Sequence, residues 1–382
     1  MRILVVSSSF FPKIDGSVRV VYDLSRKLVH RGHEVYLLTR RFPDTPAFEN
    51  FDGINVVRVG PARSSTVNRI LLCLNQMIRL VWLLEEREFD VIHSHGCVPA
   101  FVGLVGKVLK RIPLVVTFHG HEVLWPESFR WKRKIALRLQ LWLEHVVLRR
   151  VDVLVAQSMQ IRKLFTVLYG SWICAKVRVI PNGVDLDEFM IETCNEEKLQ
   201  NSAPLVLAVG TLSKIKGFDV LIKAMAIVSR VEPDARLVIV GGGPQRRVLE
   251  RLAERVRVKD SVIFTGWLDR KKLYDCYCAA DVVVLPTRAE FFPLVLLEGM
   301  AMAKPVISTK VMGPTELVVD GVNGFLVEPD NPMQLAEAIE KVILNEKLAV
   351  EMGEKGRKIV EEKYSLDKIV KQYEKIYQFL AN

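Results

Sequence analysis

The strongest constraint on the fold is a repeated pattern of short apolar runs, rich in Val, Ile and Leu, separated by helical segments. One such run, ILVVS at Ile3–Ser7, opens the first half of the chain, and another, at Pro204–Gly210, opens the second half. Continuous runs of this kind are typical of parallel strands whose two faces are both covered by helices. The pattern therefore predicts a doubly wound, Rossmann-like α/β domain in each half.

The expected strands share this composition and a length of about five residues. They are Ile3–Ser7, Glu34–Thr39, Asn55–Val59, Asp90–Ser94, Pro113–Phe118, Asp152–Ala156, Pro204–Gly210, Arg236–Gly242, Ser261–Gly266, Asp281–Pro286 and Lys304–Thr309. A chain of 382 residues is too long for one ordinary core. The polar stretch Met190–Pro204 lacks periodicity and is the expected linker. We therefore expect an N-terminal domain at 1–189, a linker at 190–204, a C-terminal domain at 205–364 and a final helix at 365–382 that packs back on the N-terminal domain.

Composition narrows the cellular setting. The amino-terminal apolar run is too short for a secretory signal, and the most apolar window, 70–84, contains Asn75, Gln76 and Arg79. The six cysteines are scattered and are expected to be reduced packing residues. We therefore expect a cytoplasmic protein, soluble or peripheral on the cytoplasmic membrane face. The net charge is +10, and most of the basic excess lies before residue 204, which favours an anionic partner there.

In doubly wound domains, ligands bind at the carboxyl ends of the strands, so the loops that follow the strands carry the functional signals. Lys214 and Lys216 lie just before a helix that is expected to start after Gly217. A lysine beside a helix amino end suits a diphosphate, while a solvated lysine pair is the alternative. Glycines at Gly16 and Gly241–Gly242 allow close backbone approach to a ligand. For Gly16, an ordinary turn with Ser17 as helix cap explains the sequence equally well.

Two carboxylates stand in the apolar stretch RAEFFPLVLLEGM, at Glu290 and Glu298. Pro286 ends a strand and Pro293 suits the first turn of a helix, so Glu290 is expected in a loop and Glu298 about one and a half turns into the helix. Buried carboxylates need hydrogen-bond donors. We expect these donors to be the hydroxyl groups of a sugar or ribose rather than a lone ion pair.

Histidines and a basic segment complete the candidates. His119 and His121, like His93 and His95, are spaced by two residues, but no matching third ligand supports zinc, so a polar role for His119 is favoured. The segment 129–150 combines basic residues with tryptophans, which is typical of a helix on an anionic membrane or of a core-packed helix with a basic outer face. Nucleic acid is disfavoured because no base-stacking module accompanies the charge. The candidate membrane or acceptor contacts are Arg130, Trp131, Lys132, Arg133, Lys134 and Arg138.

Taken together and in this order, the motifs carry a family resemblance over nearly the whole chain. The matching pieces are Pro12–Gly16, Arg31–Val35, Asp90–His95, Val116–Gly120, Ile180–Asp185, Lys216–Gly217, Gly241–Pro244 and Glu290–Glu298. The chain resembles the family-4, or group-1, retaining glycosyltransferases, whose GT-B architecture has two Rossmann-like domains facing across a cleft. It is also similar to the catalytic subunits that glycosylate phosphatidylinositol.

The resemblance implies roles for particular residues. Glu290 would bond donor-sugar hydroxyls, Glu298 would hold the ribose, Lys216 would neutralise the diphosphate with Gly16 opposite it, and His119 would lie near the transferred sugar. His119, Lys216 and Glu290 are thereby the implied catalytic residues. The implied donor-binding residues are Gly16, Thr211, Lys214, Lys216, Gly241, Gly242, Gly266, Glu290, Phe292, Pro293, Leu294, Val295 and Glu298.

The resemblance further implies transfer of a hexose or N-acetylhexosamine from a UDP- or GDP-linked donor, with retained anomeric configuration. The acceptor would be a glycan or glycolipid, and no metal or other cofactor is expected. Two positions depart from the family pattern: Thr211 stands where arginine is usual, and Pro293 stands where glycine is usual. Two alternatives remain, a sugar-nucleotide 2-epimerase of the same architecture and a non-catalytic nucleotide-sugar-binding protein.

Overall fold

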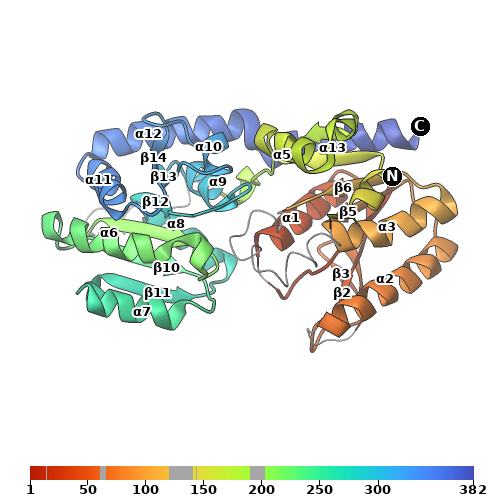
Figure 1. Ribbon diagram of the computed structural model, residues 1–382, viewed down its shortest axis with the longest axis horizontal. Helices are drawn as coiled ribbons and strands as arrows, with labels where there is room; N and C mark the ends of the chain where they lie inside the picture. The colour runs from red at the N-terminus through yellow and green to blue at the C-terminus, as the bar shows by residue number, and fades with distance from the viewer. Residues whose placement is uncertain (14, 61–65, 120–140, 143, 190–202) are drawn as a thin grey trace. The chain divides into compact units, whose positions relative to one another are not determined.

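The computed structural model describes residues 1–13, 15–60, 66–119, 141–142, 144–189 and 203–382 (Figure 1). The chain divides into two compact units, Met1–Asn182 together with Leu366–Asn382, and Gly183–Ser365. The division falls at Asn182–Gly183, ahead of the expected linker, of which residues 190–202 lie outside the described residues. The last helix, α13 (Leu366–Ala381), belongs to the first unit.

The N-terminal unit is built on an eight-stranded sheet in the order β3-β4-β2-β1-β5-β6-β7-β8. Every neighbouring pair is parallel except β3 and β4, which are antiparallel. The strands are β1 (Arg2–Ser7), β2 (Glu34–Arg40), β3 (Phe48–Phe51), β4 (Ile54–Val59), β5 (Val91–His95), β6 (Leu114–Thr117), β7 (Val153–Ala156) and β8 (Val177–Val179).

Helices cover both faces of this sheet because alternate strand residues point to opposite sides. The helices among the described residues are α1 (Gly16–His30), α2 (Thr66–Glu86), α3 (Cys97–Lys110), α5 (Met159–Tyr169), the 3₁₀ turn η3 (Ser171–Ala175) and α13. One core cluster joins Ile3 and Val5 of β1 to α1 and α13. On the alternate face, α3 comes so close that a Cβ at Gly106 would overlap the side chain of Ile92.

The amino end of α1 is capped by Asp15, whose carboxylate accepts a hydrogen bond of 2.9 Å from the Val18 amide. The hydroxyl of Ser17 donates to the same carboxylate at 2.6 Å. The prediction that Ser17 caps this helix is therefore wrong, because the residue two positions earlier carries the stronger acceptor.

The C-terminal unit contains a six-stranded, wholly parallel sheet in the order β11-β10-β9-β12-β13-β14. Its strands are β9 (Leu205–Val209), β10 (Arg236–Val240), β11 (Val262–Gly266), β12 (Val282–Leu285), β13 (Val306–Thr309) and β14 (Gly324–Val327). The fold class predicted from the sequence, a doubly wound parallel sheet in each half, is confirmed.

Two apolar clusters cover the two faces of this second sheet. One packs α6 (Phe218–Val231), α7 (Arg246–Arg255) and α11 (Pro332–Ile343) on the side of Val206 and Ala208. The other packs α8 (Arg270–Ala279) and α9 (Leu294–Ala301) on the side of Leu207 and Val209. The remaining elements are η4 (Leu186–Glu188), η7 (Lys214–Lys216), η8 (Lys259–Ser261), α10 (Pro314–Leu317), α12 (Glu346–Ile359) and the π-helical turn η9 (Val360–Tyr364).

The structure also bears on the cysteines and on membrane-spanning helices. Cys73, Cys97, Cys174 and Cys276 carry free thiols, whereas Cys278 is disulfide-bonded, so the prediction of reduced cysteines is wrong at that position. Within the described part of the chain, no helix is both long enough and apolar enough to cross a membrane.

Candidate functional site

The turn that carries Lys216 lies at the carboxyl edge of the second sheet, between β9 and α6. Gly217 caps α6 in the left-handed conformation, with φ of +67°, and a Cβ there would overlap the carbonyl oxygen of Pro286. The Lys216 ammonium forms an ion pair with the Glu290 carboxylate. A lysine therefore stands beside the amide groups that open α6, an arrangement that suits an anion.

The loop between β12 and α9 is bonded directly to this turn. The Thr287 hydroxyl donates to the carbonyl of Ile215 at 3.0 Å, and the Arg288 amide donates to the same carbonyl at 2.7 Å. The Glu290 carboxylate also accepts a hydrogen bond of 3.2 Å from the Phe291 amide. The cationic turn and the acidic loop are therefore held together by backbone contacts as well as by the ion pair.

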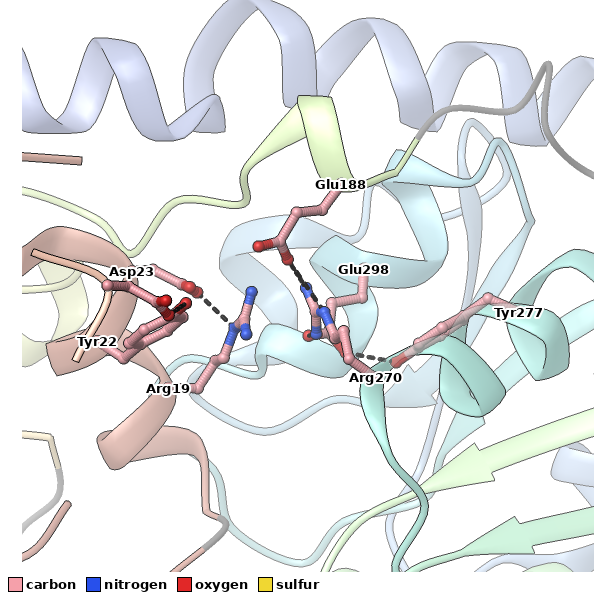
Figure 2. Close-up of polar contacts among 8 residues, drawn as sticks. Arg19, Tyr22, Asp23, Glu188, Arg270, Tyr277 and Glu298 are labelled. Atoms are coloured by element: carbon pink, nitrogen blue, oxygen red, sulfur yellow. Dashed lines mark hydrogen bonds and ion pairs between the residues drawn. The ribbon is translucent and has the colours of Figure 1, made fainter. Parts of the chain in front are cut away.

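Glu298 lies inside α9 (Figure 2). Its side chain is buried, with 7% of the residue exposed. One carboxylate oxygen accepts from the Tyr277 hydroxyl at 2.7 Å, and the other from an Arg270 guanidinium nitrogen at 3.2 Å. Arg270 also donates to Glu188 at 2.7 Å and lies over the Phe189 ring, 4.6 Å from its centroid. Burial raises the pKa of Tyr277 well above its usual value, so the phenol stays protonated and acts as the donor.

These contacts correct one expectation. The sequence predicts ligand hydroxyls, rather than a lone ion pair, as the donors to two buried carboxylates. Glu298 is buried and Glu290 is partly buried. The chain itself supplies Lys216 to Glu290, and Arg270 with Tyr277 to Glu298. Because an ionised carboxylate has about four acceptor positions, these bonds leave Glu290 and Glu298 with capacity for ligand hydroxyls.

The glycine turns predicted at the strand ends also gather at this edge. The Gly241 amide donates to the Gly266 carbonyl at 2.9 Å, and a Cβ at Gly241 would overlap the carbonyl oxygen of Gly210. Gly242 packs directly against the indole of Trp267. The ends of β9, β10 and β11 therefore approach one another through backbone alone. Thr211 is exposed in the adjoining loop, and Lys214 is exposed at the start of η7.

The residues that follow Glu290 lead into α9. Phe292 is buried and its ring packs 5.9 Å from that of Tyr364. Pro293 is the cap residue, with φ of −80°, so it precedes the first turn rather than lying within it as predicted. Leu294 and Val295 open the helix and are partly buried. The carboxyl edge of the second sheet thus brings together every predicted donor-binding residue except Gly16.

Gly16 and His119 lie in the N-terminal unit. Gly16 is the first residue of α1, next to the Asp15 cap. Burial favours the neutral form of Asp15, but hydrogen bonds from Lys13, Ser17 and the Val18 amide outweigh it and lower the pKa of this carboxyl. The amino end of α1 therefore already holds a carboxylate.

His119 is partly buried and forms a cluster with His93 and His95, which are buried. Its Nε2 is hydrogen-bonded to Nδ1 of His95 at 2.8 Å, and the two rings are parallel within 3°. His93 bonds the hydroxyls of Thr117 at 2.8 Å and Tyr377 at 2.7 Å. The signal was available, because His93 and His95 share one face of β5 and β6 pairs beside it.

Burial makes these histidines neutral. It lowers the pKa of His93 to about 3 and that of His119 to about 4, and it lowers the pKa of His95 well below 6.5. Among the described residues, no group of three His, Cys, Asp or Glu side chains is arranged to hold a metal ion. His121 lies outside the described residues.

The histidine cluster predicts a pH-dependent stability. The folded pKa of His93, about 3, lies below its unfolded value of 6.5, so the unfolded chain binds the proton first as the pH falls. The contribution of the neutral His93 to the free energy of unfolding is therefore present above pH 6.5 and is lost as the pH falls below that value. The loss for one such histidine is about 2 kcal/mol at about pH 5. Denaturant unfolding of the wild type and of His93→Gln between about pH 7.5 and 5 measures this, and equal pH slopes would contradict it.

The basic segment 129–150 is described only at residues 141–142 and 144–150. The candidate membrane contacts Arg130, Trp131, Lys132, Arg133, Lys134 and Arg138 lie outside the described residues. Within the described part, Trp142 is 61% exposed, while Glu144 is buried and accepts a hydrogen bond of 2.6 Å from the Tyr169 hydroxyl.

Comparisons with known proteins decide the family. Residues 14–188 match the family Glycosyltransferase Family 4, and residues 191–359 match the family Glycosyl transferases group 1. An uncharacterized glycosyltransferase of Methanocaldococcus jannaschii is 31% identical over 390 residues, which cover 99% of this chain and 98% of the relative. This chain is a group 1 glycosyltransferase of family 4. The family resemblance stated from the sequence is thereby confirmed.

Other relatives of this glycosyltransferase extend the comparison. D-inositol 3-phosphate glycosyltransferase of Xylanimonas cellulosilytica is 31% identical, with 85% of this chain and 82% of the relative covered. Sucrose-phosphate synthase from Thermosynechococcus elongatus superimposes with a TM-score of 0.87 and 25% identity, covering 99% of this chain and 98% of that one. The Anabaena protein HepE in complex with UDP-glucose superimposes with a TM-score of 0.78 and is 23% identical in sequence, with 99% of each chain covered. These likenesses confirm the GT-B fold class.

Proposed function

We propose that this glycosyltransferase uses a nucleoside-diphosphate sugar and transfers a hexose or N-acetylhexosamine with retained anomeric configuration. The observation that carries the proposal is the Lys216–Glu290 pair at the amino end of α6, beside the glycine turns of β9, β10 and β11. The Anabaena protein HepE forms a complex with UDP-glucose, which supports a nucleotide-sugar donor here. The donor nucleotide is proposed to be a uridine or guanosine diphosphate.

In this proposal, each group of the site binds a charged group or a hydroxyl of the donor. Lys216 and the first amides of α6 stabilise the negative charge that develops on the departing diphosphate. Glu290 accepts hydrogen bonds from the sugar hydroxyls, and Glu298, oriented by Arg270 and Tyr277, accepts from the ribose. His119, neutral at pH 7, is proposed to contact the transferred sugar. Positioning and electrostatic stabilisation then supply most of the rate enhancement.

Two residues that depart from the family pattern, Thr211 and Pro293, change the groups that are available to bind the donor. Thr211 offers a hydroxyl where the family usually has a cation, so Lys214 is proposed to supply the second positive charge from the exposed end of the turn. Pro293 has no amide hydrogen, which removes one backbone donor ahead of α9. Neither a metal nor another cofactor is proposed, and transfer is expected to be equally fast with EDTA and with Mg²⁺.

The acceptor is proposed to be a glycan or glycolipid, used at the cytoplasmic face of a membrane. Support comes from the basic excess before residue 204. The relatives named above include an enzyme of D-inositol 3-phosphate, a small polyol phosphate, so soluble polyols belong in the same screen. The comparisons give no support to the 2-epimerase alternative.

A direct assay tests this function. The full chain is incubated with UDP- and GDP-linked hexoses and N-acetylhexosamines, together with a lipid extract or a set of soluble polyols. Mass spectrometry detects transfer, and the NMR coupling constant of the anomeric proton gives the configuration. A product with the donor's anomeric configuration supports the proposal. Inversion refutes the retaining mechanism, a free epimer identifies an epimerase, and nucleotide binding without any product identifies a non-catalytic protein.

A further inference from the structure

Arg288 ties together three segments around the Lys216 turn. Its guanidinium donates to both carboxylate oxygens of Asp219, at 2.9 and 2.8 Å, in the first turn of α6. It also donates to Asp330 at 2.7 Å, in the loop between β14 and α11, and to the carbonyl oxygen of Lys214 in η7. The Arg288 amide holds the next carbonyl, that of Ile215.

We propose that Arg288 is a positioning residue of the diphosphate site, which fixes the backbone of the Lys216 turn and neutralises Asp219. This inference rests on the proposed function. The two carbonyls held by Arg288 directly precede Lys216, so the bonds set the direction in which the lysine leaves the backbone. Sub-ångström placement of charged groups around a reacting phosphate has large effects on rate.

Arg288 acts through its neighbours rather than on the ligand. A guanidinium has five N–H donors. Here Nε donates to Asp330, Nη1 donates to Asp219 and to the Lys214 carbonyl, and Nη2 donates to Asp219 and is ion-paired with Asp330. Four hydrogen bonds and two ion pairs thus hold the guanidinium within the chain. The residue therefore differs in role from Lys216, which is proposed to contact the ligand itself.

The electrostatic part of the role concerns Asp219. A carboxylate in the first turn of α6 occupies the helix end that favours anions, and without a counter-ion it would repel a diphosphate there. The paired Arg288 offsets the charge of Asp219, so a diphosphate that approaches the amino end of α6 meets less repulsion than it would from Asp219 alone. Burial favours the protonated form of Asp219, but the hydrogen bonds from Arg288 outweigh burial and lower the pKa of this carboxyl, as expected for a stable ion pair.

The experiment compares nucleotide with nucleoside. Dissociation constants are measured by calorimetry for UDP or GDP, whichever the wild type binds, and for the matching nucleoside, which lacks the phosphates. Arg288→Ala is expected to lower the affinity for the nucleoside diphosphate roughly tenfold or more. The affinity for the nucleoside should change by less than about twofold. Adding Asp219→Asn to Arg288→Ala should restore part of the loss, because it removes the uncompensated charge.

Matched variants keep the test interpretable. Arg236→Ala removes an arginine that also bonds a backbone carbonyl, that of Asp260 at 2.8 Å, but at the amino end of β10, and should change neither affinity. If Arg288→Ala does not fold, Arg288→Lys is used instead, because it keeps the positive charge but lacks the paired N–H donors of the guanidinium. It should still lower the affinity for the nucleoside diphosphate and leave that for the nucleoside unchanged. No loss, or an equal loss for nucleotide and nucleoside, overturns the inference alone. A wild type that binds no nucleoside diphosphate overturns the proposed function and the inference together.

Discussion

Replacing Lys216 with alanine is expected to lower kcat/KM for sugar transfer by about 100-fold or more, the usual effect of removing one preorganised donor from a developing negative charge. The lysine stands where the α6 amides already favour an anion, so its charge acts on the diphosphate as it departs. Its removal also leaves Glu290 without its cation at the same place. Steady-state kinetics with a saturating acceptor measure the effect.

Two further variants separate the contributions to that loss. Lys216→Ala with Glu290→Gln should bind nucleotide more tightly than Lys216→Ala alone, because the unpaired carboxylate no longer repels the diphosphate. Lys310→Ala breaks another lysine–glutamate pair of the same unit, with Glu328 at 3.0 Å, and should leave kcat/KM unchanged. If Lys216→Ala retains the wild-type kcat/KM, Lys216 does not belong to the site.

Gly217→Ala is expected to destabilise the C-terminal unit by about 2–4 kcal/mol and to abolish donor binding. The residue has φ of +67°, which costs any residue with a Cβ about 1 kcal/mol, and its Cβ would overlap the Pro286 carbonyl oxygen. Relieving that overlap must separate the Lys216 turn from the loop that carries Glu290. Urea unfolding and nucleotide calorimetry on the same variant measure both effects.

Gly321→Ala is the matched control for this change. Gly321 also has positive φ, +75°, in the same unit, but a Cβ there meets nothing within 4 Å. It should therefore show only the conformational cost, about 1 kcal/mol, and bind nucleotide normally. Equal destabilisation by the two variants would show that the close approach to Pro286 contributes nothing.

The sequence predicted the strands that form the centre of each sheet, because buried parallel strands are continuous apolar runs. It missed β3, β8 and β14, which have only three or four residues each. The sequences of β3 and β8, FENF and VRV, are short and contain polar residues, whereas β14, GFLV, is apolar but only four residues long. All three missed strands lie at a sheet edge, where strands are less buried and hydrophobic periodicity marks them less strongly, although the edge strand β11 was predicted.

The candidate site was predictable where it depends on local sequence. The turn with Lys216 and Gly217, and the spacing of Glu290 and Glu298, are local patterns of this kind. The partners of these residues were not predictable from one sequence, because Arg270 and Tyr277 lie 28 and 21 residues from Glu298, and Arg288 lies 69 residues from Asp219. Such contacts follow from the packing of α8 and α9 beside neighbouring strands and leave no periodic signal.

The most direct test of the account is a crystal structure of the full chain with bound UDP or GDP. The account predicts a phosphate oxygen within hydrogen-bonding distance of the Lys216 ammonium and the ribose hydroxyls on the Glu298 carboxylate. A nucleotide bound with its phosphates away from the amino end of α6, or with its ribose away from α9, would contradict it.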